Sequence, residues 1–319
     1  MWKKEIVQEA CRKFQGNADS LRFLGGFHQN VYEYERDGER FILKLIPIAR
    51  KDESQLNLKL QWISYLRSHG VRLPETVLSE NGRPVETIIR LPIPCCIISY
   101  KKEKGEKIHA SNPYVWNPRL LRRIGQTMGK IHSLSSRFSQ RADIPAYEEW
   151  NEGEIFYRDF SFVDGWIADR FSLFLQKVRS FPRNSQSYGL IHNDFQPGGF
   201  LVDPHDQVIL FDFKHIKYHF FTYEIATLLF HALEGFPEKN HETLKDSFIH
   251  SLMEGYFLEH HLEDGWQEQV DFFLEYRLFF LYISLLTLIP TEKLNHWQKE
   301  QLVRLKSRLE KRQFLVRTE

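Results

Sequence analysis

The sequence predicts an α+β protein with two lobes, a small antiparallel sheet followed by a mainly helical lobe. Three observations predict this architecture. Short apolar runs separated by turn residues fill the first part of the chain, a charged stretch with a glycine follows at residues 101–107, and apolar residues at helical spacing dominate the remainder. We therefore expect an N-terminal lobe over residues 1–98, a hinge over 99–107 and a helical C-terminal lobe over 108–319.

The N-terminal lobe is expected to contain two helices and a set of short strands. The helices span residues 5–14 and 54–69, and Gly70 ends the second one. The expected strands are 21–24, 31–36, 39–46, 76–78, 85–90 and 95–100. Asp37-Gly38 and Asn81-Gly82 are typical hairpin turns, so neighbouring strands should pair in antiparallel fashion.

The C-terminal lobe is expected to be helical because apolar residues recur there every three or four positions. The expected helices are 118–134, 164–178, 222–234, a series of long helices from 244 onward, and 297–316. The apolar run at residues 278–289 is too short to span a bilayer and predicts a buried helix.

Composition excludes several classes of function. The chain has 319 residues, 42% of them apolar and 27% charged, as in ordinary globular proteins. The net charge of +1 gives no electrostatic argument for nucleic acid or an anionic membrane, so we expect neither as a partner. Three cysteines form neither a disulfide framework nor a metal set, and no apolar signal core opens the chain. We expect reduced thiols and a cytoplasmic protein.

The most informative stretch is 190–213, where two aspartates flank a predicted hairpin. The apolar runs 200–202 and 208–211 read as strands joined by a turn. A hairpin brings the residues before its first strand and after its second to one end, so Asp194 and Asp212 should lie near each other. Two carboxylates beside a glycine-containing loop suit a site for a metal ion and a reacting hydroxyl. The alternative is a surface hairpin with acidic ends.

This stretch resembles the catalytic segment of the aminoglycoside phosphotransferase and choline kinase family, relatives of the protein kinases. The family pattern is His-Gly-Asp, three residues, Gly-Asn, a short hairpin and an aspartate between phenylalanines. The sequence here reads His-Asn-Asp-Phe-Gln-Pro-Gly-Gly over residues 192–199 and Phe-Asp-Phe over 211–213. The resemblance covers most of the chain and implies the bilobal protein-kinase-like fold.

The resemblance implies an ATP-dependent phosphotransferase that moves the γ-phosphate of ATP to a hydroxyl of a small molecule. Asp194 would then accept or orient the hydroxyl proton, and His192 would brace the catalytic loop. Asp212 would hold Mg²⁺ against the nucleotide phosphates. The expected cofactors are therefore ATP and Mg²⁺.

Lys44 is the expected phosphate-binding lysine of the N-terminal lobe. It interrupts an apolar stripe formed with Ile42 and Ile46 on one face of the predicted strand. A lysine in that position must reach water, a carboxylate or a phosphate. The family resemblance assigns it to nucleotide phosphates, and the alternative is a lysine whose ammonium simply reaches solvent.

A glycine-rich turn precedes the second strand and is the other expected part of the nucleotide site. Gly25 and Gly26 would let the backbone approach a phosphate, and Asn30 would close the turn as in the family pattern. The alternative is an ordinary tight turn.

Several positions depart from the family pattern. Gly199 stands where the family has an asparagine, and Gln196 is the candidate replacement as a metal ligand. Lys59 occupies the position expected for a glutamate that pairs with Lys44, which predicts repulsion. Glu53 would be the partner if the helix register differed.

Two further departures follow the hairpin. Lys214-His215 stands where acidic residues often occur, and Glu224 could replace a structural aspartate of the next helix. These departures leave two main interpretations, a working small-molecule kinase or a degenerate kinase-like scaffold of the spore-coat-associated type. An unrelated α+β binding protein is a third.

The acceptor is expected to bind near residues 147–166, which combine acidic and aromatic side chains. Such walls suit a cationic amine or amino alcohol. The alternative is a solvated acidic stretch whose aromatic residues belong to the core.

Overall fold

The structure, a computed structural model, divides into two compact units. It describes residues 2–26, 29–47, 52–89, 94–108, 112, 115–138, 147–157, 159–289 and 291–316. The first unit comprises residues 1–108 with 199–214, and the second comprises 109–198 with 215–319. The expected boundaries at residues 98 and 107 stay a prediction. The structure adds that the predicted hairpin groups with the first unit.

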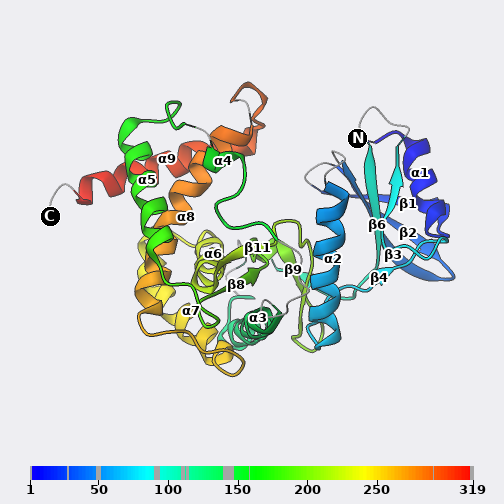
Figure 1. Ribbon diagram of the computed structural model, residues 1–319, viewed down its shortest axis with the longest axis horizontal. Coiled ribbons are helices and arrows are strands. Elements are labelled where there is room, and N and C mark those ends of the chain that lie inside the picture. The colour runs from blue at the N-terminus through cyan, green and yellow to red at the C-terminus, as the bar shows by residue number, and fades with distance from the viewer. Residues whose placement is uncertain are drawn as a thin grey trace. The chain divides into compact units, whose positions relative to one another are not determined.

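The first unit is built on an antiparallel sheet, as the sequence predicts (Figure 1). Its strands follow the order β1, β2, β3, β6 and β4, with β5 also paired to β6. The prediction that the strands on either side of Asn81-Gly82 pair with each other is wrong, because β4 and β5 both pair with β6. Their bounds are β1 Asn17–Gly25, β2 Val31–Arg36, β3 Glu39–Pro47, β4 Thr76–Val77, β5 Glu86–Ile88 and β6 Cys95–Lys101. The two helices are α1 Lys4–Lys13 and α2 Asp52–Ser68.

Alternation along β3 separates the core of the first unit from the candidate site. Phe41, Leu43 and Leu45 are buried and pack in one cluster with residues of α1. Lys44, between two of them, points to the opposite face of the sheet because successive strand residues alternate. The Asp37-Gly38 turn before β3 has positive φ at both residues, 52° and 77°, as a hairpin turn of this kind requires.

The predicted hairpin is present in the first unit. Strands β9 (Phe200–Val202) and β10 (Val208–Leu210) pair with Phe200 opposite Leu210, and β7 (Glu106–Lys107) adds a third strand beside β9. The end of the expected hinge is therefore a short strand. This pairing explains why the hairpin groups with the N-terminal part of the chain.

The second unit is mainly helical (Figure 1). Its helices are α3 Pro118–Phe138, α4 Glu154–Tyr157, α5 Gly165–Ser180, α6 Phe221–Leu233, α7 His241–Tyr256, α8 Trp266–Leu288 and α9 His296–Val316. A two-stranded sheet of β8 (Tyr188–Ile191) and β11 (Lys217–Phe220) leads into the candidate catalytic loop and into α6. The apolar run at 278–289 forms the end of α8 apart from Ile289, as the predicted helix requires, but it is buried on one side only, since Leu288 is exposed. No described helix is long and apolar enough to cross a membrane.

Helices α3 and α7 approach each other through glycines. A Cβ atom on Gly125 would lie 1.8 Å from the carbonyl oxygen of Leu252, and one on Gly255 would lie 1.9 Å from that of Arg122. Backbone atoms cannot move aside as a flexible side chain can. The glycines therefore set the separation of the two helices, and this packing supports the helix that begins the second unit.

We predict that Gly125→Ala destabilises the protein, although alanine is the better helix former. The added methyl group overlaps the Leu252 carbonyl, and overpacking of this kind costs about 1–3 kcal/mol. Gly165→Ala, at the first position of α5 with open space around it, is the matched control. Urea unfolding at neutral pH measures the difference. Equal midpoints for the two variants would contradict the close approach of α3 and α7.

Candidate active site

An ion pair between Lys44 and Asp212 forms the centre of the candidate site in the first unit. The Lys44 Nζ atom lies 2.5 Å from the Asp212 Oδ1 atom, and about a quarter of each side chain is exposed, 23% and 30%. Lys44 belongs to strand β3, and Asp212 lies two residues after the end of β10. The lysine that the sequence selected therefore binds a carboxylate, one of the three partners expected for it.

Asp212 is held by its backbone and by a second lysine. Its φ of 66° lies in the left-handed region, which is uncommon for a residue other than glycine and is typical of functional positions. The Lys214 Nζ atom lies 3.1 Å from Asp212 Oδ2. Burial would raise the pKa of Asp212, but the ammonium groups of Lys44 and Lys214 outweigh burial and hold the pKa well below its ordinary value. Asp212 is therefore an anion at neutral pH.

The predicted glycine turn precedes the Lys44 strand. Gly25 and Gly26 both have positive φ, 118° and 94°, so glycine is required there for conformation. The buried Asn30 side chain donates to the carbonyl oxygen of Leu45 at 2.7 Å. Asn30 thus ties the turn to the strand beside Lys44. Phe27 and His28, at the tip, lie outside the described residues, and a role of this turn in phosphate binding stays a prediction.

Helix α2 contacts the Asp212 loop through side chains that differ from those expected. The sequence placed Lys59 opposite Lys44 and predicted repulsion. In the structure Lys59 Nζ donates to the backbone carbonyl oxygen of Lys214 at 2.5 Å, while Lys44 pairs with Asp212. Trp62 lies edge-on to the buried ring of Phe213, 5.8 Å between centroids. The side chain of Glu53 lies outside the described residues.

The predicted catalytic loop follows β8 in the second unit. His192 is fully buried, and Asn193 has a φ of 64°, which turns the chain sharply before Asp194. Asp194 and Gln196 are half-buried. The burial of His192 agrees with a bracing role. The catalytic role of Asp194 and the metal-binding role of Gln196 stay predictions.

A buried hydrogen-bonded network anchors this loop to α6 and α3. Glu224 Oε1 accepts the backbone N–H of Asn193 at 2.7 Å, and Glu224 Oε2 lies 2.9 Å from His132 Nε2. His132 Nδ1 in turn lies 2.8 Å from the hydroxyl of Tyr256. Glu224 therefore holds the loop as expected for the residue that replaces the structural aspartate. No sequence pattern distinguishes His132 or Tyr256 from other buried residues.

The protonation of this network departs from that of exposed groups. Burial raises the pKa of Glu224 to about 7, despite the opposing effect of His192 and of the backbone N–H groups it accepts. Burial lowers the pKa of His132 to about 3. Between about pH 3 and pH 7 the pair therefore consists of a neutral carboxyl group and a neutral imidazole, which avoids an unpaired buried charge.

The donor set around Asp212 fits a magnesium ion that arrives with a nucleotide. Among the described residues, no group of three or more His, Cys, Asp or Glu side chains is arranged to hold a metal ion. Magnesium requires few protein ligands when phosphate oxygens and water complete its shell. The anionic Asp212 carboxylate supplies one hard oxygen ligand of the kind required.

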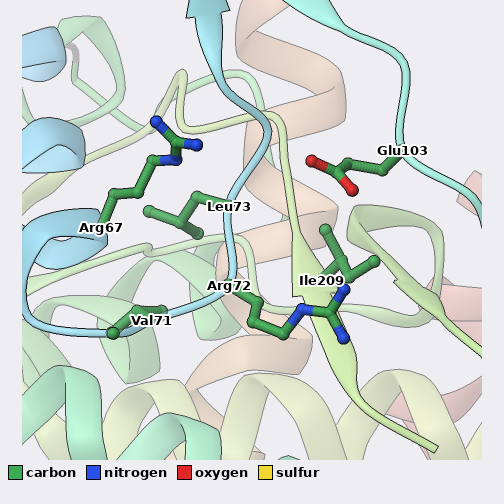
Figure 2. Close-up of a pocket in the computed structure, with 7 residues that line it drawn as sticks. Arg67, Val71, Arg72, Leu73, Glu103 and Ile209 are labelled. Carbon is green, nitrogen blue, oxygen red and sulfur yellow. The ribbon is translucent and has the colours of Figure 1, made fainter. Parts of the chain in front are cut away.

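The first unit also contains a hollow that none of the predicted site residues line. It lies between the end of α2, the following loop and β10, and it is lined by Arg67, Gly70, Val71, Arg72, Leu73, Glu103 and Ile209 (Figure 2). Its two arginines already have partners. Arg67 pairs with Glu75 at 3.3 Å, and Arg72 pairs with Asp203 of the hairpin turn. The Arg72–Asp203 pair fastens the hairpin to the loop after α2, and the Arg67–Glu75 pair ties that loop to the end of α2, so both arginines have a structural role.

The expected acceptor segment at 147–166 is exposed over about half of its described residues, and part of it is held within the second unit. Glu148 pairs with Lys217 at 3.1 Å, and Glu149 pairs with Arg183 at 3.1 Å. Trp150 is buried against His219 and Phe156. Part of the acidic and aromatic character therefore serves the second unit itself. A cationic acceptor stays a prediction. Glu148 and Glu149 do not support it, because both already pair with basic side chains.

Comparison with known proteins identifies the family. The model of the phosphotransferase enzyme family matches residues 20–267, which is more than half of the chain. The chain therefore belongs to the phosphotransferase enzyme family, and the predictions of the family and of a phosphotransferase enzyme are confirmed. The amicoumacin kinase of Bacillus subtilis (strain 168) is 26% identical to this chain over 307 residues, 94% of this chain and 90% of that protein.

Solved structures share the fold. The structure of an amicoumacin kinase in complex with AMP-PNP, Ca²⁺ and its ligand has a TM-score of 0.85 at 24% identity and covers 98% of this chain and 94% of that one. A microcompartment-associated aminopropanol kinase has a TM-score of 0.73 at 18% identity, covering 96% and 94%. Choline kinase from Streptococcus pneumoniae has a TM-score of 0.62 at 12% identity, covering 95% and 97%. The expected kinase-like α+β fold is confirmed, and the comparisons give no support to a degenerate scaffold.

We predict that Glu224→Gln changes the pH dependence of stability. The raised pKa of Glu224 makes its contribution fall as the pH rises from 4.5 to about 7, whereas the lowered pKa of His132 makes its contribution rise from about pH 3 to 6.5. The two slopes oppose each other between pH 4.5 and 6.5 in the natural protein. Glutamine removes only the falling slope.

The free energy of unfolding of Glu224→Gln should therefore rise with pH across this window, relative to the unchanged protein, by up to about 1.4 kcal/mol per pH unit. Urea unfolding at a series of pH values between 4.5 and 6.5 measures the slope. Parallel pH profiles for the two proteins would show that the pKa of Glu224 is not raised in the folded protein.

Proposed function

We propose that the chain transfers the γ-phosphoryl group of ATP to a hydroxyl group of a small molecule. The observation that carries this proposal is the pairing of Lys44 with Asp212, which lie 168 residues apart in the sequence. In kinases a strand lysine contacts the nucleotide phosphates and an aspartate in this setting binds the metal ion. Family membership supports the same reaction class.

Each proposed role follows from the chemistry of phosphoryl transfer. Lys44 contacts the phosphates, and the Asp212 carboxylate holds a divalent cation, which supplies charge neutralisation for the phosphates when bound. Asp194 accepts the proton of the acceptor hydroxyl. The hydroxyl oxygen forms a bond to the γ-phosphorus while the bond to the β–γ bridging oxygen breaks, and ADP leaves.

The anchoring of the catalytic loop supports the role proposed for Asp194. Phosphoryl transfer depends on positioning more than on covalent chemistry, so the base must be held in place. Glu224 accepts a hydrogen bond from the backbone N–H of Asn193, the residue immediately before Asp194. The preceding residue, His192, is buried. Asp194 itself is half-buried.

We propose an amine-containing hydroxyl compound as the acceptor. This choice is supported by the relatives, whose names include amicoumacin kinase, aminopropanol kinase and choline kinase. The reaction itself does not specify the acceptor, because one fold serves many substrates. Screening amicoumacin, aminopropanol and choline with ATP and Mg²⁺ is the first step, and transfer to one of them supplies the assay for the variants below.

We predict that Asp194→Asn retains nucleotide binding and loses phosphoryl transfer. Loss of a positioned general base lowers kcat by about 10²–10⁴-fold. Binding of AMP-PNP should change little, because Asp194 is proposed to contact the acceptor. Asp264→Asn, at an exposed turn of the second unit, is the matched control. Steady-state transfer and calorimetric AMP-PNP binding measure the two effects. Undiminished transfer by Asp194→Asn would remove Asp194 from the mechanism.

A further inference from the structure

Lys214 places a second positive charge on the candidate metal ligand. Its Nζ atom lies 3.1 Å from Asp212 Oδ2, while Lys44 occupies Asp212 Oδ1 at 2.5 Å. One carboxylate is thus flanked by two ammonium groups on its two oxygens. The Lys214 side chain is 42% exposed, so its ammonium group can also reach a ligand that arrives from solvent.

The backbone holds Lys214 in this position. Its N–H donates to the carbonyl oxygen of Asp212 at 2.7 Å, and its own carbonyl oxygen accepts a hydrogen bond from Lys59. The intervening Phe213 is buried against Trp62 of α2. The position of Lys214 is therefore set by the same loop that sets Asp212, and an accidental surface contact would lack these constraints.

Gly199, at the start of the hairpin and close to Asp212 in the structure, leaves the site without an asparagine side chain. Phe200 lies opposite Leu210, and the N–H of Phe211 donates to the carbonyl oxygen of Gly199 at 3.0 Å. The ladder therefore continues to Gly199 and Phe211, the neighbour of Asp212 in sequence. In protein kinases an asparagine of the catalytic loop holds a second metal ion. Gly199 has no side chain that could bind one.

We propose that Lys214 replaces a second metal ion, contacting the nucleotide phosphates beside Asp212, so that the site works with one divalent cation. This inference rests on the proposed function. A lysine ammonium is a compact charge that binds phosphate well, and it needs no protein ligand set. Two ammonium groups and one divalent cation then neutralise the phosphates, and the charge that develops during transfer is stabilised by groups already in place.

The number of bound cations tests the proposal without an activity assay. Mn²⁺ is titrated into protein saturated with AMP-PNP, and free Mn²⁺ is followed by its electron paramagnetic resonance signal. We expect one Mn²⁺ per bound nucleotide. The double variant Gly199→Asn/Lys214→Asn should bind a second Mn²⁺, because it regains an oxygen ligand and loses the competing charge. Two Mn²⁺ ions in the unchanged protein would overturn the proposal.

Nucleotide affinity provides the second readout. Lys214→Met should raise the Kd for AMP-PNP at saturating Mn²⁺ by about tenfold or more, and Lys214→Arg should restore most of the affinity because the charge is kept. Lys101→Met is the matched control, since this exposed lysine of the same unit pairs with Glu39 at the surface. Equal affinities for Lys214→Met and Lys101→Met would show that Lys214 is only a surface ion pair.

The two proposals fail in different ways. If the unchanged protein binds no AMP-PNP, the proposed function and this inference both fall. If it binds AMP-PNP with two Mn²⁺ ions, or if Lys214→Met binds as tightly as the unchanged protein, the phosphotransferase proposal stands and only the role of Lys214 is overturned.

Discussion

The ion pair between Lys44 and Asp212 is the interaction on which the candidate site depends. It joins strand β3 to the loop after β10, segments separated by most of the chain length, inside one compact unit. The anion is maintained by positive charge, since burial by itself would favour the neutral carboxyl group. The left-handed backbone at Asp212 is the conformational cost of directing the carboxylate toward the lysine. A charged, constrained carboxylate of this kind is what a nucleotide-bound cation requires.

In the second unit the corresponding requirement is to hold the candidate catalytic loop in place. Glu224 achieves this from α6 by accepting a backbone N–H of the loop, and His132 of α3 holds Glu224 in turn. The close glycine contact of α3 with α7 brings Tyr256 within reach of His132. The packing of α3 on α7, the contact between His132 and Glu224, and the position of the loop are thus linked. Phosphoryl transfer requires the protein to position the reacting groups and to do little covalent chemistry itself, and these hydrogen bonds position the loop.

Sequence reasoning predicted the hairpin, the Lys44 strand and the two-part architecture because periodicity and turn chemistry are local properties. It identified Glu224 only by its place in a motif. It could not predict the contact between Glu224 and His132, which are 92 residues apart, because periodicity shows which face of a helix is buried but not which side chain meets it. Lys59 shows the same limit. Its expected repulsion with Lys44 rested on a helix register, whereas the structure directs its ammonium group to a backbone oxygen.

Charged residues were the other place where the structure differed from the expectations drawn from the sequence. The acidic segment at 147–166 suggested a cationic ligand, yet Glu148 and Glu149 already have basic partners within the second unit. Conversely, Lys214 looked like the loss of a family feature and proved to contact the central carboxylate. The sequence shows how many charged residues a segment contains, whereas the structure shows which of them form ion pairs.

Calorimetric titration of the protein with AMP-PNP, in Mg²⁺ and in EDTA, tests the central claim most directly, that Asp212 holds a cation delivered with the nucleotide. The account predicts tight binding in Mg²⁺ that weakens strongly in EDTA, and loss of this metal dependence in Asp212→Asn. Binding that is indifferent to Mg²⁺, or an Asp212→Asn variant with unchanged metal dependence, would contradict it.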